Sequence, residues 1–143
     1  MRVLVLLLAV CCLAFTTEHF RATHVFMIGD STMANKPERN LPEYGWGQVL
    51  NHFFTDRIVV DNHAKNGRSS KSFIEEGSWE KVITQVQKGD YVIIQFGHND
   101  QKSDTTRFTG PFDTYQDNLK RFINEAKDKG GIPILCTSIV RRL

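Results

Sequence analysis

Short apolar runs separated by polar segments recur along the chain from His24 onward. Four of these runs, at residues 24–28, 57–60, 91–96 and 132–139, are bounded by glycine or by polar clusters. Short, bounded runs of this kind are typical of buried β-strands. The sequence therefore predicts four strands, of which 91–96 has the strongest pattern.

Between these strands, apolar residues recur at the spacing of an amphipathic helix. This spacing predicts helices over residues 47–54, 78–86 and 111–129, with Ser78 as the N-cap of the second. Polar segments that contain proline or glycine predict loops at 36–44, 62–70 and 100–110.

Strands that alternate with helices indicate βαβ units, and hence an α/β fold with a parallel sheet and right-handed crossovers. In open sheets of this class, ligands bind beyond the carboxyl ends of the strands. The residues that directly follow each predicted strand are therefore the candidates for a ligand site.

Three polar motifs follow the predicted strands: Gly29-Asp30-Ser31-Thr32, Asn66-Gly67-Arg68 and Gly97-His98-Asn99-Asp100. A serine at a strand end can present a nucleophilic hydroxyl and an amide N–H, provided that a helix N-terminus follows it. The Gly67 amide and the Asn99 carboxamide could donate hydrogen bonds to an oxyanion. Each motif also has a purely structural interpretation: an N-cap at Ser31, an Asn-Gly turn at Gly67, and an asparagine bonded to its own backbone at Asn99.

The composition excludes several classes of protein. The chain of 143 residues is long enough for one domain, and its net charge is +2 with acids and bases interspersed. No block of like charge indicates a nucleic-acid or membrane surface, and no cysteine–histidine cluster has the spacing of a zinc site. We expect a monomer that needs no metal or organic cofactor.

The N-terminus has the pattern of a secretory signal peptide. A positive start at Arg2 precedes 13 apolar residues from Val3 to Phe15, too few for a membrane span of about 20 residues. We expect a signal peptide over residues 1–16, cleavage after Thr16, and a secreted or periplasmic protein. The alternative is an uncleaved, buried N-terminal element. Cleavage would leave Cys136 without a disulfide partner, as a small core residue.

The three motifs, in this order and at these strand ends, resemble those of the SGNH (GDSL-type) hydrolase family. The longer strings at residues 28–32, 62–69 and 95–100, and the tail at 137–142, are similar to those of rhamnogalacturonan acetylesterases. The resemblance implies a secreted serine esterase that removes acetyl groups from pectic polysaccharide. The alternatives are a non-catalytic carbohydrate-binding remnant, or an esterase or lipase of the same family that acts on another acyl ester.

The resemblance also implies roles for individual residues. Ser31 would be the nucleophile, and the amides of Ser31 and Gly67 with the Asn99 side chain would form the oxyanion hole. Asp30, His98 and Asp100 would support these loops.

The family takes its histidine base from a late Asp-x-x-His block, a pattern that this sequence lacks. His63 is a poor substitute, so we expect little activity from these residues alone. Lys65 and Arg68 could favour acidic sugars or be solvated loop charges.

The family fold implies a three-layer α/β/α arrangement with strand order 2-1-3-4-5. The sequence accounts for the first four strands, so we expect the domain at 23–143 to lack its last strand and helix. A truncated gene or a partial sequence would explain this. The strand at 132–139 would then be an exposed apolar edge.

Overall fold

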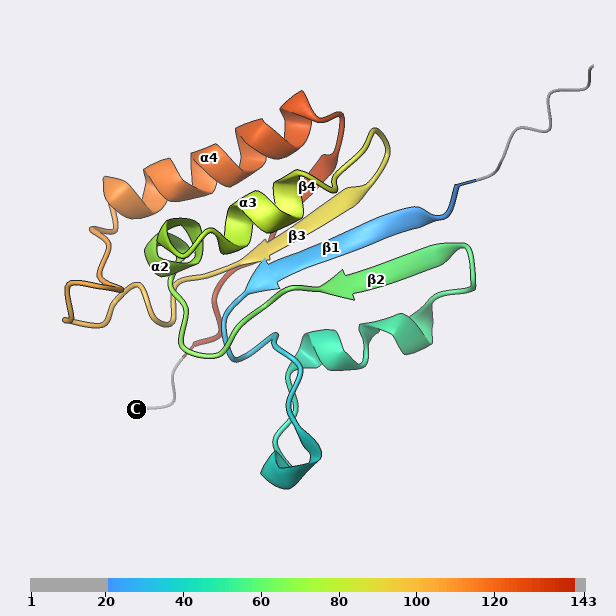
Figure 1. Cartoon of the computed structure of the whole chain (residues 1–143). Coiled ribbons are helices and arrows are strands. Elements are labelled where there is room, and N and C mark those ends of the chain that lie inside the picture. The colour runs from blue at the N-terminus through green and yellow to red at the C-terminus, as the bar shows by residue number, and fades with distance from the viewer. Residues whose placement is uncertain (1–20, 141–143) are drawn as a thin grey trace, which may run out of the picture.

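The computed structural model describes residues 21–140 as an α/β fold around a parallel sheet (Figure 1). Residues 1–20 and 141–143 are not described, so the predicted signal peptide at 1–16 lies outside the described residues. The strands are β1 (Thr23–Gly29), β2 (Ile58–Asn62), β3 (Tyr91–Gln95) and β4 (Ile132–Leu135). Their order in the sheet is β2-β1-β3-β4, and every neighbouring pair is parallel. The α/β class and the order of these four strands are confirmed.

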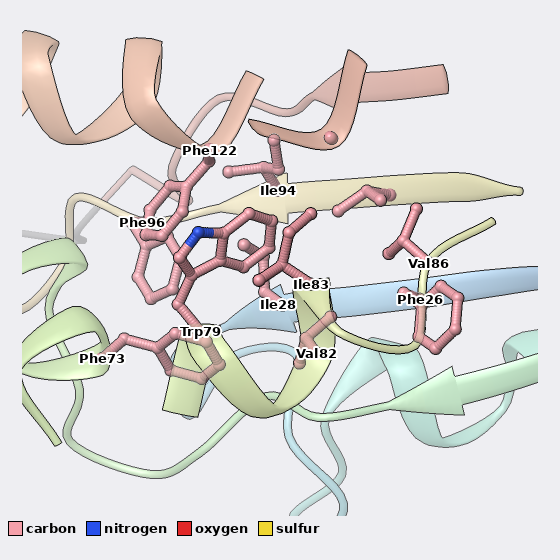
Figure 2. Close-up of a cluster of buried hydrophobic side chains, with 12 residues drawn as sticks. Phe26, Ile28, Phe73, Trp79, Val82, Ile83, Val86, Ile94, Phe96 and Phe122 are labelled. Carbon is pink, nitrogen blue, oxygen red and sulfur yellow. The ribbon is translucent and has the colours of Figure 1, made fainter. Parts of the chain in front are cut away.

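Three α-helices cover one face of the sheet (Figure 1). They are α2 (Ser70–Glu75), α3 (Ser78–Ile83) and α4 (Thr114–Asp128). Every second residue of β1 and β3 points toward them, so the apolar runs become one wall of an aromatic core (Figure 2). The Trp79 and Phe122 rings meet edge to face at 4.9 Å, and Phe73 and Phe96 are also fully buried. This core holds β3 and β1 in place under the loops that follow them.

The other face of the sheet is covered by the short 3-10 helices η2 (Trp46–Gln48) and η3 (Leu50–Phe53), whose Trp46 and Leu50 side chains pack against it. A further 3-10 helix, η1 (Glu38–Asn40), buries no residue. The α-helix predicted over 47–54 is therefore wrong. The amides of Trp46 and Gly47 donate to the carbonyls of Thr32 and Met33, which holds the segment to the first loop. Within it, the amides of Val49 and His52 donate three residues back, so the ladder is that of a 3-10 helix.

Other helix predictions also differ from the structure: α3 ends at Ile83 instead of residue 86, and α4 begins at Thr114 instead of Pro111. Helix α2 was not predicted, although Ser69 and Ser72 form a reciprocal capping box at its start. Ser78 is the first residue of α3 rather than its cap, because Gly77 occupies the N-cap position.

Strand β4 is shorter than the predicted run at 132–139. It ends at Leu135, and beyond it Thr137 accepts a hydrogen bond from the Gln95 side chain instead of continuing the ladder. Ile132, Ile134 and Leu135 are exposed, as expected for an edge strand in the described part of the chain. Cys136 is half-buried rather than in the core, and burial raises the pKa of its thiol.

Candidate active site

Ser31 lies in a tight turn that directly follows β1. The amides of Met33 and Ala34 both donate to the Asp30 carbonyl, at 3.2 and 3.0 Å. This is a turn and not a helix N-terminus, so the predicted helix start at Ser31 is wrong. The turn holds Ser31 half-buried at the surface, and its side chain makes no hydrogen bond within residues 21–140.

Asp30 fixes the shape of this turn from inside. Its side chain is buried, and Oδ1 accepts hydrogen bonds from the amide and the hydroxyl of Thr32 at 2.9 and 2.8 Å. A carboxylate that bonds the backbone two residues onward forms an Asx-turn, which stabilises a sharp change of direction. Asp30 therefore orients the segment that carries Ser31.

Gly67 lies at the third position of a turn from Lys65 to Arg68. The Arg68 amide donates to the Lys65 carbonyl across this turn at 3.4 Å. The φ of Gly67 is +76°, while no described non-glycine residue has a positive φ, so the turn is of type II. A Cβ at Gly67 would meet no atom within 4 Å, so the space above this residue is open. The turn thus exposes backbone at a place where a ligand can approach.

Asn99 joins the second and third loops. It is 5% exposed, and its Nδ2 donates to the Arg68 carbonyl at 3.0 Å. A carboxamide has two N–H groups, so one remains for a ligand. The side chain therefore bonds the neighbouring loop, not its own backbone.

Asp100 supports the third loop from below. Its carboxylate accepts from the Ser70 amide at 3.0 Å and hydroxyl at 2.5 Å, from the Thr109 hydroxyl at 3.0 Å, and from the Gly97 amide at 3.0 Å. Burial raises the pKa of Asp100, although these donors oppose the rise. The group is a buried junction between β3, α2 and the loop before α4.

Gln95, which the sequence did not single out, connects the first loop to the sheet. Its Oε1 accepts from the Thr32 hydroxyl at 3.3 Å and from the Trp46 indole at 2.7 Å, while its amide donates to the Thr137 carbonyl. With the Asn99–Arg68 bond and the bond from the Lys65 amide to the Gly29 carbonyl, the loops of Ser31, Gly67 and Asn99 form one hydrogen-bonded edge. A polar residue at the last position of a buried strand was the signal available for Gln95.

The two histidines singled out from the sequence lie differently. The His63 ring packs against Phe26 at 6.0 Å, and burial lowers its pKa and favours the neutral ring. His98 is half-buried in the turn of the third loop.

The cations of the second loop already have partners. Lys65 donates to the Ser78 hydroxyl, while Arg68 pairs with Glu76 at 2.9 Å and also donates to the Asn66 carbonyl. A polar hollow of about 440 Å³ adjoins Arg68, and it is lined by Gly67, Arg68, Ser72, Glu76, Asp104, Thr106 and Arg107.

Within residues 21–140, no three histidine, cysteine or acidic side chains are grouped as a metal site would require. No helix in this range is long and apolar enough to span a membrane.

A parallel α/β sheet with a serine, a backbone amide and a carboxamide on linked loops at its carboxyl edge defines a class of hydrolytic sites. The sequence profile of the GDSL-like lipase/acylhydrolase family matches residues 25–141. The chain belongs to this family.

Curated relatives support a narrower grouping. The rhamnogalacturonan acetylesterase RhgT of Bacillus subtilis is 45% identical over 118 residues, which are 82% of this chain and 50% of the relative. The probable rhamnogalacturonan acetylesterase YesY of the same organism is 38% identical over 84% of this chain and 55% of its own length. The chain thus spans about half the length of these relatives.

Solved structures share the fold. The crystal structure of the protein YxiM of Bacillus subtilis superposes with a TM-score of 0.72 at 28% identity, over 80% of this chain and 32% of that one. The lipase/acylhydrolase of Enterococcus faecalis has a TM-score of 0.60 at 21% identity, over 84% of this chain and 59% of that one, and shows the fold alone.

Proposed function

We propose that this chain carries the nucleophile and the oxyanion hole of a secreted carboxylic ester hydrolase that removes acetyl groups from rhamnogalacturonan. The observation that carries the proposal is the hydrogen-bonded edge that joins the loops of Ser31, Gly67 and Asn99. The substrate class is taken from the relatives named rhamnogalacturonan acetylesterases.

The chemistry is acyl transfer in two steps. The Ser31 oxygen forms a bond to the carbonyl carbon of the acetyl group as the Ser31 proton passes to a base. The carbonyl oxygen then becomes an oxyanion. The amides of Ser31 and Gly67 and the Asn99 carboxamide stabilise this charge. The sugar oxygen then leaves and takes up a proton. Water hydrolyses the acetyl-serine and releases acetate.

The base is expected from an Asp-x-x-His block, a pattern absent from these 143 residues. His63 is an unsuitable replacement because its ring lies against Phe26. We therefore expect slow turnover by these residues alone, because none of them replaces the histidine that takes the Ser31 proton.

A second candidate function is hydrolysis of another acyl ester by the same Ser31 chemistry. It is favoured by the match to the lipase/acylhydrolase family, whose description names no polysaccharide. A third candidate function is carbohydrate binding without catalysis.

The test measures acetate release from acetylated rhamnogalacturonan, and separately the hydrolysis of 4-nitrophenyl acetate. Ser31→Ala should remove the enzymatic rate on both, because no other group replaces the nucleophile. Ser103→Ala, in an exposed loop, is the matched control and should change nothing. Turnover that survives Ser31→Ala would overturn the proposal. Ser31-dependent turnover of the small ester alone would favour the second candidate.

A further inference from the structure

The peptide bond between Asn66 and Gly67 carries the amide that the proposed mechanism uses. In a planar trans peptide, the carbonyl of Asn66 and the N–H of Gly67 point in opposite directions. Whatever holds the carbonyl therefore sets the direction of the N–H.

The turn itself does not fix that direction. Type I and type II turns differ mainly by reversal of their central peptide, and glycine at the third position accepts both. The open space at Gly67 means that packing around its Cα does not select one form. A reversed peptide would aim the Gly67 N–H away from the oxyanion.

Two cationic side chains bind Asn66: one at the carbonyl of this peptide and one at the side-chain amide. The Arg68 Nη1 donates to the Asn66 carbonyl at 3.0 Å, and the Lys36 Nζ donates to the Asn66 Oδ1 at 2.8 Å. The Lys36 side chain is 2% exposed, and its ammonium also forms an ion pair with Glu43 at 3.0 Å. A buried ammonium has few alternative partners, so its bond to Asn66 is costly to break.

Both cations belong to segments that carry other parts of the site. Lys36 follows the Ser31 turn. Its backbone amide donates to the Gln48 side chain at 2.9 Å, which fixes Lys36 to the 3-10 helix η2. The Arg68 carbonyl accepts from Asn99. Arg68 thus orients one oxyanion donor through its side chain and the other through its backbone.

We propose that Arg68 and Lys36 are positioning residues that lock the Asn66–Gly67 peptide in the orientation an oxyanion hole requires. This inference rests on the proposed function for the role of the Gly67 amide. The locked peptide can be tested without activity.

The main experiment is ¹⁵N relaxation of this chain, with the order parameter of the Gly67 amide as the readout. In the unsubstituted chain we expect a rigid value of about 0.85, and in Arg68→Gln a value below about 0.6. Arg107→Gln is the matched control, because Arg107 lines the same hollow and pairs with Asp104 but makes no bond to this peptide. Glu76→Gln removes the ion pair of Arg68 and leaves its bond to the carbonyl, so it should have little effect.

Lys36→Met removes the ammonium while keeping an apolar stem. If this variant does not fold, Asn66→Ala removes the same contact from the exposed side. Either change should also lower the Gly67 order parameter.

A kinetic arm separates orientation from charge. With 4-nitrophenyl acetate, Arg68→Gln should lower kcat about tenfold with KM unchanged, which is part of the 10²–10³-fold lost when an oxyanion donor is removed. Arg68→Lys keeps the charge but lacks the planar fork, so it should recover little of the loss.

Unchanged Gly67 dynamics in both Arg68→Gln and Asn66→Ala would overturn the inference and leave the proposed esterase intact. Loss of the esterase proposal, by turnover independent of Ser31, would leave the relaxation result unaffected.

Discussion

Asp90 and Asp100 each place a buried carboxylate near one end of β3, and the two carboxylates have different hydrogen-bond partners. At the amino end, Asp90 receives a two-pronged ion pair from Arg21 at 2.6 and 2.9 Å, and the amides of His24 and Gln87. At the carboxyl end, Asp100 is bonded by hydroxyl and amide donors, with no cation among them. The end with a full charge pair is scaffold, and the end held by neutral donors adjoins the candidate site.

The difference appears in the pKa values. Burial opposes ionisation of Asp90, but the bonds from Arg21, His24 and Gln87 outweigh it and hold the pKa below its usual range. Burial dominates at Asp100 and raises its pKa. At Asp100, neutral donors from Ser70, Gly97 and Thr109 therefore organise the loop, and none of these donors is a cation.

The largest effect should come from deleting each carboxylate. Asp100→Ala leaves the buried amide of Ser70 and the half-buried amide of Gly97 without acceptors, so it should lower the free energy of unfolding by about 3 kcal/mol or more. Asp90→Ala should cost about 2–3 kcal/mol, because the part-exposed Arg21 can turn to water. Urea denaturation measures both, with the exposed Asp117→Ala as a control expected within about 0.5 kcal/mol. A larger loss for Asp90→Ala would contradict the comparison.

The glycines that flank β3 provide a second contrast. At Gly97, with φ at +132°, a Cβ would lie 2.9 Å from the Ser138 Cβ, so Gly97→Ala combines backbone strain with a clash and should cost about 2–4 kcal/mol. At Gly89, with φ at +89°, a Cβ would meet nothing within 4 Å, and Gly89→Ala should cost only the left-handed backbone term of about 1–2 kcal/mol. Thermal unfolding of the two variants measures the difference. Equal costs would show that the carboxyl end is looser than the structure indicates.

The smallest effect is a difference in pH dependence with opposite signs. The lowered pKa of Asp90 gives stability that is present above its ordinary value of 3.8 and is lost as pH falls through the folded-state pKa. The raised pKa of Asp100 gives stability that is present below 3.8 and is lost as pH rises through its folded-state pKa.

Asp90→Asn should therefore reduce the loss of unfolding free energy as the pH falls below about 4. Asp100→Asn should reduce the loss of unfolding free energy as the pH rises above that value. Urea midpoints from about pH 3 to about pH 7 measure both slopes. Slopes of the same sign would refute the assignment of the two environments.

The sequence predicted the strands well because their information is local, whereas their order in the sheet came from the family resemblance. Glycine and polar residues bound each apolar run, and the alternation of strands and helices fixes a parallel sheet with few possible connections. The predicted helix at 47–54 failed because the amides of Val49 and His52 bond three residues back, as in a 3-10 helix. The start of this segment is tied to the first loop through Gly47 and Met33, a contact that no local spacing reveals.

At the candidate site, the sequence identified the residues but not the bonds that arrange them. Ser31, Gly67 and Asn99 were found by type and by position after strands, and their catalytic roles stay predictions. The bonds from Asn99 to Arg68 and from Ser70 to Asp100 join residues 31 and 30 positions apart. Such pairings follow from the folded topology, and the strand pattern alone does not contain them.

Beyond the last residue of β2, the chain keeps following β1: the His63 amide donates to the Met27 carbonyl, and the Lys65 amide to the Gly29 carbonyl. The start of the second loop is therefore in fixed register with β1, and each residue advances about 3.3 Å along that strand. A deletion between Lys65 and Gly67 would draw the open backbone back by one such step. Loop length at this place therefore sets how far along β1 the Gly67 backbone lies relative to the Ser31 turn.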